Sequence, residues 1–201
     1  MKRAMSPVSM DAHVLGTLKF IRDSIETSGA MPIPGTAGVA MGATGLIACS
    51  IASLPMLRPH WQLVWLIAAP IALLVGAMLM ARNSSSSGRL LRIAAARKFL
   101  LALCPALFAG TVLTFVLKQV GAVALLAPTW LMLYGCSVLS SSSVTSAMFG
   151  KRVAAMGAVF MLLGSVTYAL PLGLHNVALG VGFGGLHLAF GLLIGRLQHE
   201  H

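Results

Sequence analysis

His187 is the residue whose type and position best suit chemistry inside an apolar segment of this 201-residue chain. Its imidazole changes charge near physiological pH, so within a membrane span it can sense a proton or touch a substrate. The structural alternative is a neutral imidazole that joins two helices through a hydrogen bond. We expect Thr129, Tyr134 or a backbone carbonyl as the partner, and the sequence leaves both roles open.

Glycines recur around His187 at steps of three and four residues, which places them on one face of a helix. They are Gly180, Gly184, Gly191 and Gly195. A helix face without side chains allows a neighbouring helix to approach closely. We therefore expect this face, with His187 in it, to be buried in a helix bundle.

A second stripe of small residues lies near the start of the first long apolar segment. Gly38, Gly42 and Gly45 lead into Cys49 at helical spacing, which predicts another helix-packing face. The stripe leaves open whether its partner helix lies in the same chain, in a second copy that forms a homo-oligomer, or in another membrane protein.

Acidic residues are missing from every apolar segment. The four acids are Asp11, Asp23, Glu26 and Glu200. A cation that crosses hydrocarbon needs a compensating charge at that depth, so a carrier driven by Na⁺ or H⁺ is not expected.

The sequence predicts no catalytic, cofactor-binding or metal site. The three cysteines lie in apolar segments without paired spacing, and His199 and His201 beside one acid cannot close a metal site. The serines within residues 140–146 have no neighbouring acid or histidine in sequence that would activate a nucleophile. We therefore expect a protein that is not an enzyme and that carries no cofactor.

Six apolar stretches must position these residues, each near the roughly 20 residues that cross a ~30 Å hydrocarbon core. We place them at residues 36–54, 61–81, 99–117, 120–138, 153–171 and 177–195. Hydrophobic residues make up 58% of the chain and charged residues only 9%, a composition typical of proteins in a bilayer. The sequence thus predicts an all-α, polytopic transmembrane bundle.

The remaining residues flank this bundle. Residues 10–26 carry an apolar stripe at helical spacing opposite paired charges, which predicts an amphipathic helix in the membrane interface. A short helix packed on the protein's own loops is the alternative. The chain is therefore divided into an N-terminal segment (1–33), a six-helix transmembrane domain (34–196) and a tail (197–201).

Lysine and arginine are distributed unevenly between the two sides of the predicted membrane. Of the 14, only Arg58 and Lys118 lie on the side away from the termini. The positive-inside rule therefore predicts that both termini lie in the cytoplasm. The net charge of +10 then reflects orientation and contact with the lipid bilayer, and no nucleic-acid partner is expected.

Two short strings suggest an internal repeat. Gly110-Thr-Val and Val123-Ala-Leu recur 54 residues later as Gly164-Ser-Val and Val177-Ala-Leu. If the first two spans form an earlier copy, the bundle consists of three two-helix hairpins.

Several strings together resemble a family of small bacterial six-span membrane proteins without an assigned activity. They are Leu18-Lys-Phe-Ile-Arg22, Pro34-Gly-Thr-Ala-Gly-Val-Ala-Met-Gly42, Arg97-Lys-Phe99, Leu131-Met-Leu-Tyr-Gly135 and Gly182-Phe-Gly-Gly-Leu-His187. The paired helices, whose second member ends in Val-Gly or aromatic-Gly, are also similar to HdeD-like acid-resistance membrane proteins. The resemblance implies a bacterial cytoplasmic membrane and a compact bundle, and it supplies no reaction and no site residues.

These observations favour a non-enzymatic bundle that acts through association or stress sensing. The alternative is a small-solute permease or channel with a central cavity at His187, Thr129 and Tyr134, which requires a water-accessible crevice. A membrane enzyme that acts on lipid is a third hypothesis, for which only basic residues and serines at the cytoplasmic interface are available.

Overall fold

The structure, a computed structural model, describes residues 14–18, 33–83, 89–145 and 147–199. All regular elements within these ranges are helices, and six segments are long and apolar enough to cross a membrane. The predicted all-α six-span bundle is therefore confirmed, and the chain has the build of a multi-pass membrane protein. Residues 14–18 form a short helix, and the rest of the predicted helix at 10–26 lies outside the described residues.

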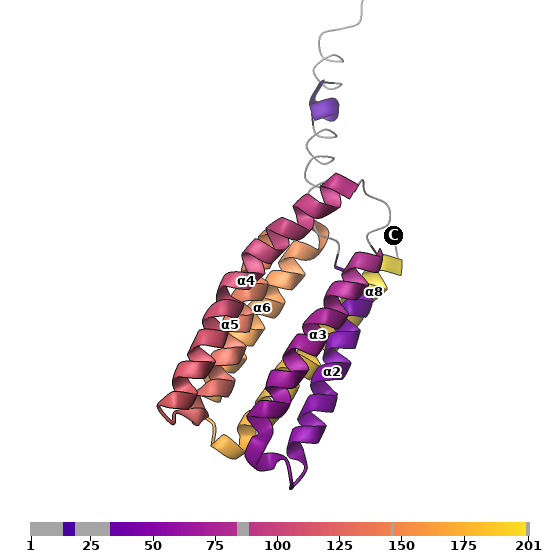
Figure 1. Cartoon of the computed structure of the whole chain (residues 1–201). Coiled ribbons are helices and arrows are strands. Elements are labelled where there is room, and N and C mark those ends of the chain that lie inside the picture. Colours follow the sequence, from indigo (N-terminus) through magenta and orange to yellow (C-terminus); the bar gives the residue numbers. More distant parts are fainter. Residues whose placement is uncertain (1–13, 19–32, 84–88, 146, 200–201) are drawn as a thin grey trace, which may run out of the picture.

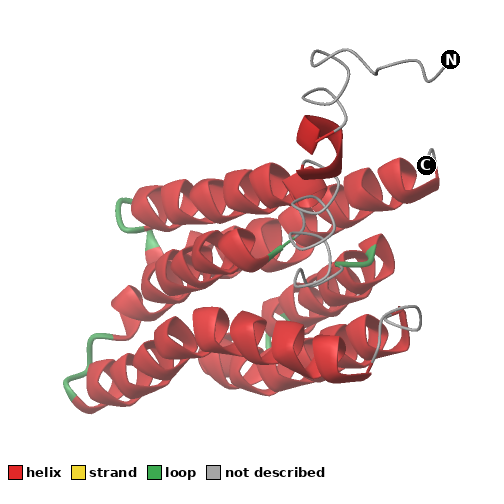
Figure 2. Ribbon diagram, turned by 90° about the horizontal axis from the view of Figure 1, so that it is seen from above, coloured by secondary structure: helices red, strands yellow, loops and turns green. Residues whose placement is uncertain are grey.

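The first five spans are continuous helices (Figure 2). They are α2 (Gly35–Ser53), α3 (Trp61–Asn83), α4 (Arg89–Gln119), α5 (Leu126–Ser141) and α6 (Ala147–Thr167). The last span is composite. It consists of α7 (His175–Leu179), a π-helical segment η5 (Gly180–Leu186) and α8 (His187–His199), which follow one another without a break.

Several helix boundaries differ from those predicted from hydropathy; α6, for example, runs from Ala147 to Thr167 instead of over residues 153–171. α4 begins at Arg89 instead of residue 99, because its first turns are made of good helix formers that are not all apolar. α5 begins at Leu126 instead of residue 120, because Gly121 has a positive φ of 75° just after α4 ends. Hydropathy detects the part of a helix inside the hydrocarbon and not the ends of the helix itself.

The second helix of each sequential pair follows one turn of 3₁₀-helix. These turns are Arg58–His60, Val123–Leu125 and Leu172–Leu174. The last two begin 49 residues apart (172 minus 123), whereas the repeated strings are 54 residues apart. The repeated strings therefore do not occupy equivalent places in the hairpins.

The helices form two groups of three (Figure 1). In the α2 group, α2 packs against both α3 and α8, and in the α5 group, α5 packs against both α4 and α6. The first two sequential pairs are thus packed hairpins, but the third pair separates, with α6 on α5 and α8 on α2. Contacts of α7 and η5 with α5 and α6 join the two groups.

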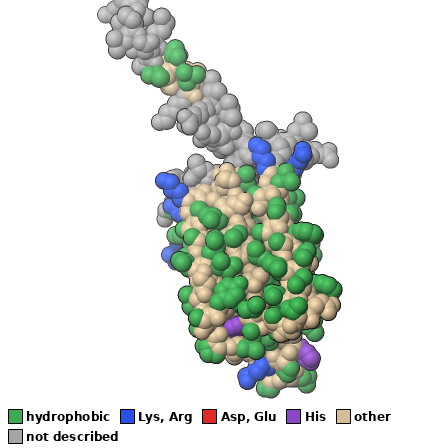
Figure 3. All heavy atoms as spheres, turned by 90° about the vertical axis from the view of Figure 1, so that its left-hand side faces the viewer, with side chains coloured by type: hydrophobic (Ala, Val, Ile, Leu, Met, Phe, Trp, Pro, Cys, Tyr) green, Lys and Arg blue, Asp and Glu red, His purple; other side chains and the backbone are tan. Residues whose placement is uncertain are grey.

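The bundle has two distinct ends. The end where α2 begins holds most of the described cations, and we call it the basic end; the end with the 3₁₀ turns, called the turn end, holds Arg58 and Lys118. Figure 3 shows hydrophobic side chains over the flank between these ends. Large apolar side chains such as Phe108 and Leu101 are exposed there, as expected for a surface that faces lipid.

The two glycine stripes meet between α2 and the last span. A Cβ atom on Gly38 would lie 2.8 Å from the Cα of Gly191, and one on Gly45 would lie 2.6 Å from the Phe183 carbonyl carbon. A Cβ atom on Gly42 would lie 2.7 Å from the Leu188 backbone nitrogen. Because backbone atoms cannot shift at low cost, these positions require glycine for the helices to pack this closely.

Three other predicted packing glycines also face α2. A Cβ atom on Gly180 or Gly184 would approach Cys49 or Leu46 of α2, each at 2.5 Å, whereas one on Gly195 would make ordinary contact. The stripe on α2 therefore has its partner within the same chain.

Candidate functional site

Tyr134 and His187 form a buried polar pair between the two helix groups. The Tyr134 hydroxyl lies 2.7 Å from His187 Nε2, and only 4% of the His187 surface is exposed. Tyr134 lies on α5, and His187 is the first residue of α8. The structure thus brings together two of the three residues that the sequence suggested for this site.

Thr129 does not take part in this pair. Its hydroxyl lies 3.2 Å from the hydroxyl of Tyr168, near the turn end. Thr129 precedes Tyr134 by more than one helical turn, so the two side chains leave α5 at different heights. The expectation that Thr129 lines the same cavity is therefore not met.

Aromatic rings surround the polar pair. The ring centroid of Tyr134 lies 4.9 Å from that of Phe160 and 5.0 Å from that of Phe183. The ring centroids of Phe160 and His187 lie 5.4 Å apart. These four residues, which we call the aromatic cluster, come from α5, α6 and the last span. They provide an apolar environment with defined ring contacts, in which a hydrogen bond is shielded from water.

The π-helical segment places Phe183 and His187 in the aromatic cluster. A π-helix closes each hydrogen bond over one more residue than an α-helix, which changes the angular position of the residues that follow. Gly180 and Gly184 accordingly face α2, while the imidazole of His187 points to α5 and α6. Gly180, Gly184 and Gly191 thus share one face toward α2, as expected, whereas the His187 side chain points away from that face.

Two cavities meet at the polar pair. The larger, of about 790 Å³, extends toward the basic end, and the smaller, of about 460 Å³, extends toward the turn end. Tyr134 and His187 line both cavities, together with Met41, Leu73 and Leu107. We call the two cavities together the cleft, and each has a volume typical of small-molecule sites, roughly 300–1,000 Å³.

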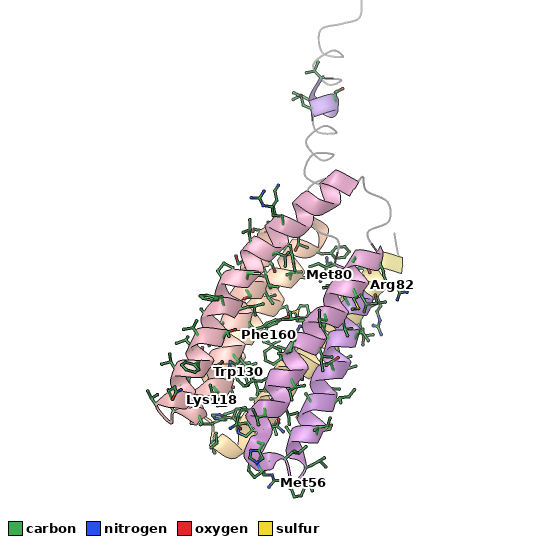
Figure 4. All side chains as sticks on the ribbon, viewed as in Figure 1. Met56, Met80, Arg82, Lys118, Trp130 and Phe160 are labelled. Atoms are coloured by element: carbon green, nitrogen blue, oxygen red, sulfur yellow. The ribbon has the colours of Figure 1, made fainter. Side chains whose placement is uncertain are left out.

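The cleft lies between α3 and α4, which make almost no contact with each other. Of the most apolar 18-residue stretch of each span, only 11% is buried in α3 and 6% in α4. Figure 4 shows the separation of these helices, with Phe160 between the groups and Trp130 and Lys118 toward the turn end. The cleft therefore opens sideways, in the direction that lipid chains occupy.

The cleft has few free polar groups on its walls. The hydroxyls of Thr44, Thr111, Thr114 and Ser141 each donate to a carbonyl oxygen of their own helix. Thr114 also accepts a hydrogen bond of 2.8 Å from the Trp130 indole. Side chains bonded in this way give a wall that suits hydrocarbon better than water or ions.

His187 Nδ1 is the exception within the cleft. This atom is buried without a well-formed hydrogen bond, although the carbonyls of Gly182 and Phe183 lie nearby. In the neutral tautomer whose Nε2 accepts a hydrogen bond from the Tyr134 hydroxyl, Nδ1 carries the ring hydrogen. The pair therefore holds one weakly bonded donor close to the middle of the cleft.

Sequence reasoning missed Asn176, which links three elements at the turn end. Its side-chain oxygen accepts a hydrogen bond of 2.8 Å from Trp65 Nε1. Its side-chain nitrogen donates to the Cys49 carbonyl at 3.0 Å and to the Ser53 hydroxyl at 2.9 Å. The signal available in the sequence was a lone asparagine at the start of an otherwise apolar span.

The other candidates for chemistry lie apart from the cleft or have structural partners. Ser142 and Ser143 donate to carbonyl oxygens three residues earlier in the chain. In the parts of the chain that the structure describes, no three His, Cys, Asp or Glu side chains lie close enough to hold a metal ion.

Comparison with known proteins supplies no relative for this arrangement. The family resemblance drawn from short strings therefore stays a prediction. No protein-family model, no curated protein and no solved structure matches the chain.

Proposed function

We propose that the protein acts by association, as a membrane receptor or sensor for an apolar molecule that enters the cleft from the bilayer, and that it catalyses no reaction. The observation that carries this proposal is the cleft itself. It is open between α3 and α4, its wall hydroxyls are bonded to their own helices, and it reaches the Tyr134–His187 pair. An apolar molecule that enters from the bilayer is already out of water, so it can gain van der Waals contacts with the cleft walls and loses no hydrogen bonds.

A small-solute permease is the second candidate, because the cleft does reach His187. A polar solute would have to exchange its water shell for polar groups along its path. The hydroxyls along this cleft are already bonded within their helices. This favours a lipophilic ligand over a polar solute.

An enzyme that acts on lipid has less support. Ser142 and Ser143 each donate the hydroxyl hydrogen to a backbone carbonyl oxygen and not to a side-chain base. A serine without a neighbouring base is a weak nucleophile.

We further propose that the protein lies in a bacterial cytoplasmic membrane with the basic end in the cytoplasm. The described cations of that end are Arg82, Arg89, Arg92, Arg97, Lys98, Lys151, Arg152 and Arg196. Such an excess over Arg58 and Lys118 favours this orientation. In spheroplasts, an impermeant thiol reagent should label Met56→Cys from outside, and Ser143→Cys only after permeabilisation.

Labelling of a cysteine at position 187 tests the proposed function. His187→Cys is made in a variant whose three native cysteines are replaced, and it is treated with a lipophilic maleimide or with a charged, impermeant thiol reagent. We expect the lipophilic reagent to react and the charged one to fail from both sides of the membrane. The positive control for the charged reagent is Met56→Cys, because Met56 is 85% exposed.

The two reagents separate the two candidates. Reaction of position 187 with the charged reagent would show a water-filled path and favour the permease. Reaction with neither reagent, in a variant that elutes as a folded protein, would contradict the proposed receptor, because the cleft would then be closed to lipophilic molecules.

A further inference from the structure

We propose that the ligand of the large cavity is an anionic membrane lipid, with its headgroup at the basic end and one hydrocarbon chain in the cavity down to the Tyr134–His187 pair. This inference rests on the proposed function, since it names the ligand of the same cleft. It adds a group of cations at the mouth of the cavity to a site whose walls are apolar.

Cations stand on both sides of the mouth of the large cavity. On α3, Arg82 directly follows the lining residue Ala81, and on α4, Arg97 and Lys98 directly precede the lining residue Phe99. All three cationic side chains are exposed. Figure 4 shows Arg82 at the end of α3, beside Met80 of the cavity wall.

We call Arg82, Arg97 and Lys98 the cationic rim. Guanidinium and ammonium groups bind phosphate oxygens through charge-assisted hydrogen bonds. None of the four acidic residues of the chain falls in the described ranges, so no carboxylate described by the structure neutralises the rim. The rim is therefore suited to a phosphate headgroup at the surface of the bilayer.

The depth of the large cavity matches one leaflet. Along α4 its lining runs from Phe99 to Leu107, and along α3 from Ala81 to Leu73. Eight residues of α-helix rise by about 12 Å. Half of the hydrocarbon core is roughly 15 Å thick. A chain whose headgroup lies at the rim therefore ends near the polar pair.

The floor of the cavity suits a chain end. Tyr134 and His187 bond to each other, and the rings of Phe160 and Phe183 pack around them. A terminal methyl group can contact these rings without breaking the hydrogen bond between Tyr134 and His187.

The small cavity is a weaker candidate for the same ligand. Its lining contains one cation, Lys118. Toward the turn end, the Trp61 and Trp130 rings contact each other at 6.0 Å, and Trp130 bonds to Thr114. The charge and the open volume therefore both favour the basic end.

Photocrosslinking of defined lipids tests this proposal on the full chain in vesicles. The probes are phosphatidylglycerol and phosphatidylcholine that carry the same photoreactive group at the end of one acyl chain. We expect phosphatidylglycerol to label the floor of the large cavity, near Leu73, Leu107 and Tyr134. Given three rim cations, it should do so more strongly than phosphatidylcholine, by roughly tenfold to a hundredfold.

Two sets of variants separate the headgroup from the chain. Arg82→Gln with Arg97→Gln and Lys98→Gln should reduce phosphatidylglycerol labelling to the level of phosphatidylcholine, whereas Arg58→Gln with Lys118→Gln at the turn end should change neither. Ala77→Phe, which narrows the large cavity, should remove labelling by both lipids. The control for this variant is Ala158→Phe, because Ala158 is exposed and lies outside both cavities. If Ala77→Phe does not fold, Leu103→Trp on the opposite wall of the large cavity replaces it.

The outcomes distinguish this inference from the proposed function. Equal labelling of the cavity by both lipids, or no effect of the rim substitutions, would overturn the anionic ligand and leave a receptor for an uncharged lipophile. Labelling confined to outer faces, unchanged by Ala77→Phe, would overturn both the lipid ligand and the receptor.

Discussion

Tyr134 and His187 depend on each other because each is the other's polar partner between the helix groups. The hydroxyl and Nε2 lie 2.7 Å apart in surroundings made of aromatic rings. A hydrogen bond between helices in a membrane contributes on average ~0.6 kcal/mol, but an imidazole nitrogen left buried without a partner costs more, about 1–3 kcal/mol. The loss of one partner therefore matters more than the bond itself.

Tyr134→Phe should destabilise the protein by about 1–2 kcal/mol, because it leaves His187 Nε2 unpaired while keeping the ring contacts. Unfolding by denaturant in detergent micelles measures this change. Tyr168→Phe is the matched control, since Tyr168 is half exposed and should cost less than about 0.5 kcal/mol. Equal stabilities of both variants would show that the pair contributes nothing to the fold.

Asn176→Ala should lower stability by about 1–3 kcal/mol, because it removes the acceptor of Trp65 and the donor to Cys49. The Trp65 indole then loses its hydrogen-bond partner, so the tryptophan emission maximum should also shift. Thermal unfolding and fluorescence of the purified protein measure the two effects. Ser50→Ala, which removes only a bond within α2, should change neither, and a similar loss there would contradict the role given to Asn176.

At the scale of the helices, the α2–α8 contact depends on the absence of side chains. A Cβ atom on Gly191 would lie 2.6 Å from the Val39 backbone nitrogen and 2.8 Å from the Gly38 carbonyl carbon. Replacing glycine by alanine within a helix stabilises the helix by up to ~1 kcal/mol through the higher helix propensity of alanine. Overpacking a close contact costs about 1–3 kcal/mol. The steric cost wins because both opposing atoms belong to the backbone.

Gly191→Ala should therefore destabilise the protein by up to about 2 kcal/mol, which is the overpacking cost less the gain in helix propensity. Gly185→Ala is the matched control in the same span, since a Cβ atom there meets nothing within 4 Å. Thermal unfolding of both variants in detergent measures the effect. A stabilised Gly191→Ala variant would show that the helices can move apart at little cost.

Much of the fold follows from the sequence at this scale. Apolar length predicted all six spans, and the glycine spacing predicted the packing faces of α2 and the last span. The π-helical segment was not predicted, because a run such as Gly182–Leu186 is compatible with either helix type until its neighbours are known. The order of helix packing also was not predicted, since apolar faces do not identify their partners.

The candidate site was predicted in part. A polar residue in an apolar span was the signal for His187, and Tyr134 was one of its expected partners. The two residues are 53 positions apart in the sequence, and the spacing of apolar residues does not indicate which helices contact each other. A cavity at His187 and Tyr134 was part of the permease hypothesis, but its opening between α3 and α4 was not predicted. The opening lies where these two helices make almost no contact with each other, and neither helix sequence indicates this.

At the scale of the whole molecule, the interface between the two helix groups, which we call the joint, keeps the walls of the cleft in place. Each group is internally well packed, through α2 with α8 and α5 with α6. The aromatic cluster lies where the groups meet, and Phe160 is fully buried there against Tyr134, Phe183 and His187. Loss of this ring should therefore loosen the joint before it loosens either group.

Phe160→Ala should destabilise the protein by about 3–5 kcal/mol, because it leaves a large void in a buried contact. Hydrogen exchange followed by mass spectrometry should show faster exchange in η5 and the facing part of α5, with α2 less affected. Phe108→Ala, at a side chain that is 72% exposed, should leave both exchange and stability nearly unchanged. Uniformly faster exchange through all six spans would instead indicate that the two groups unfold as a single unit, and that the cleft is not held by a separate joint.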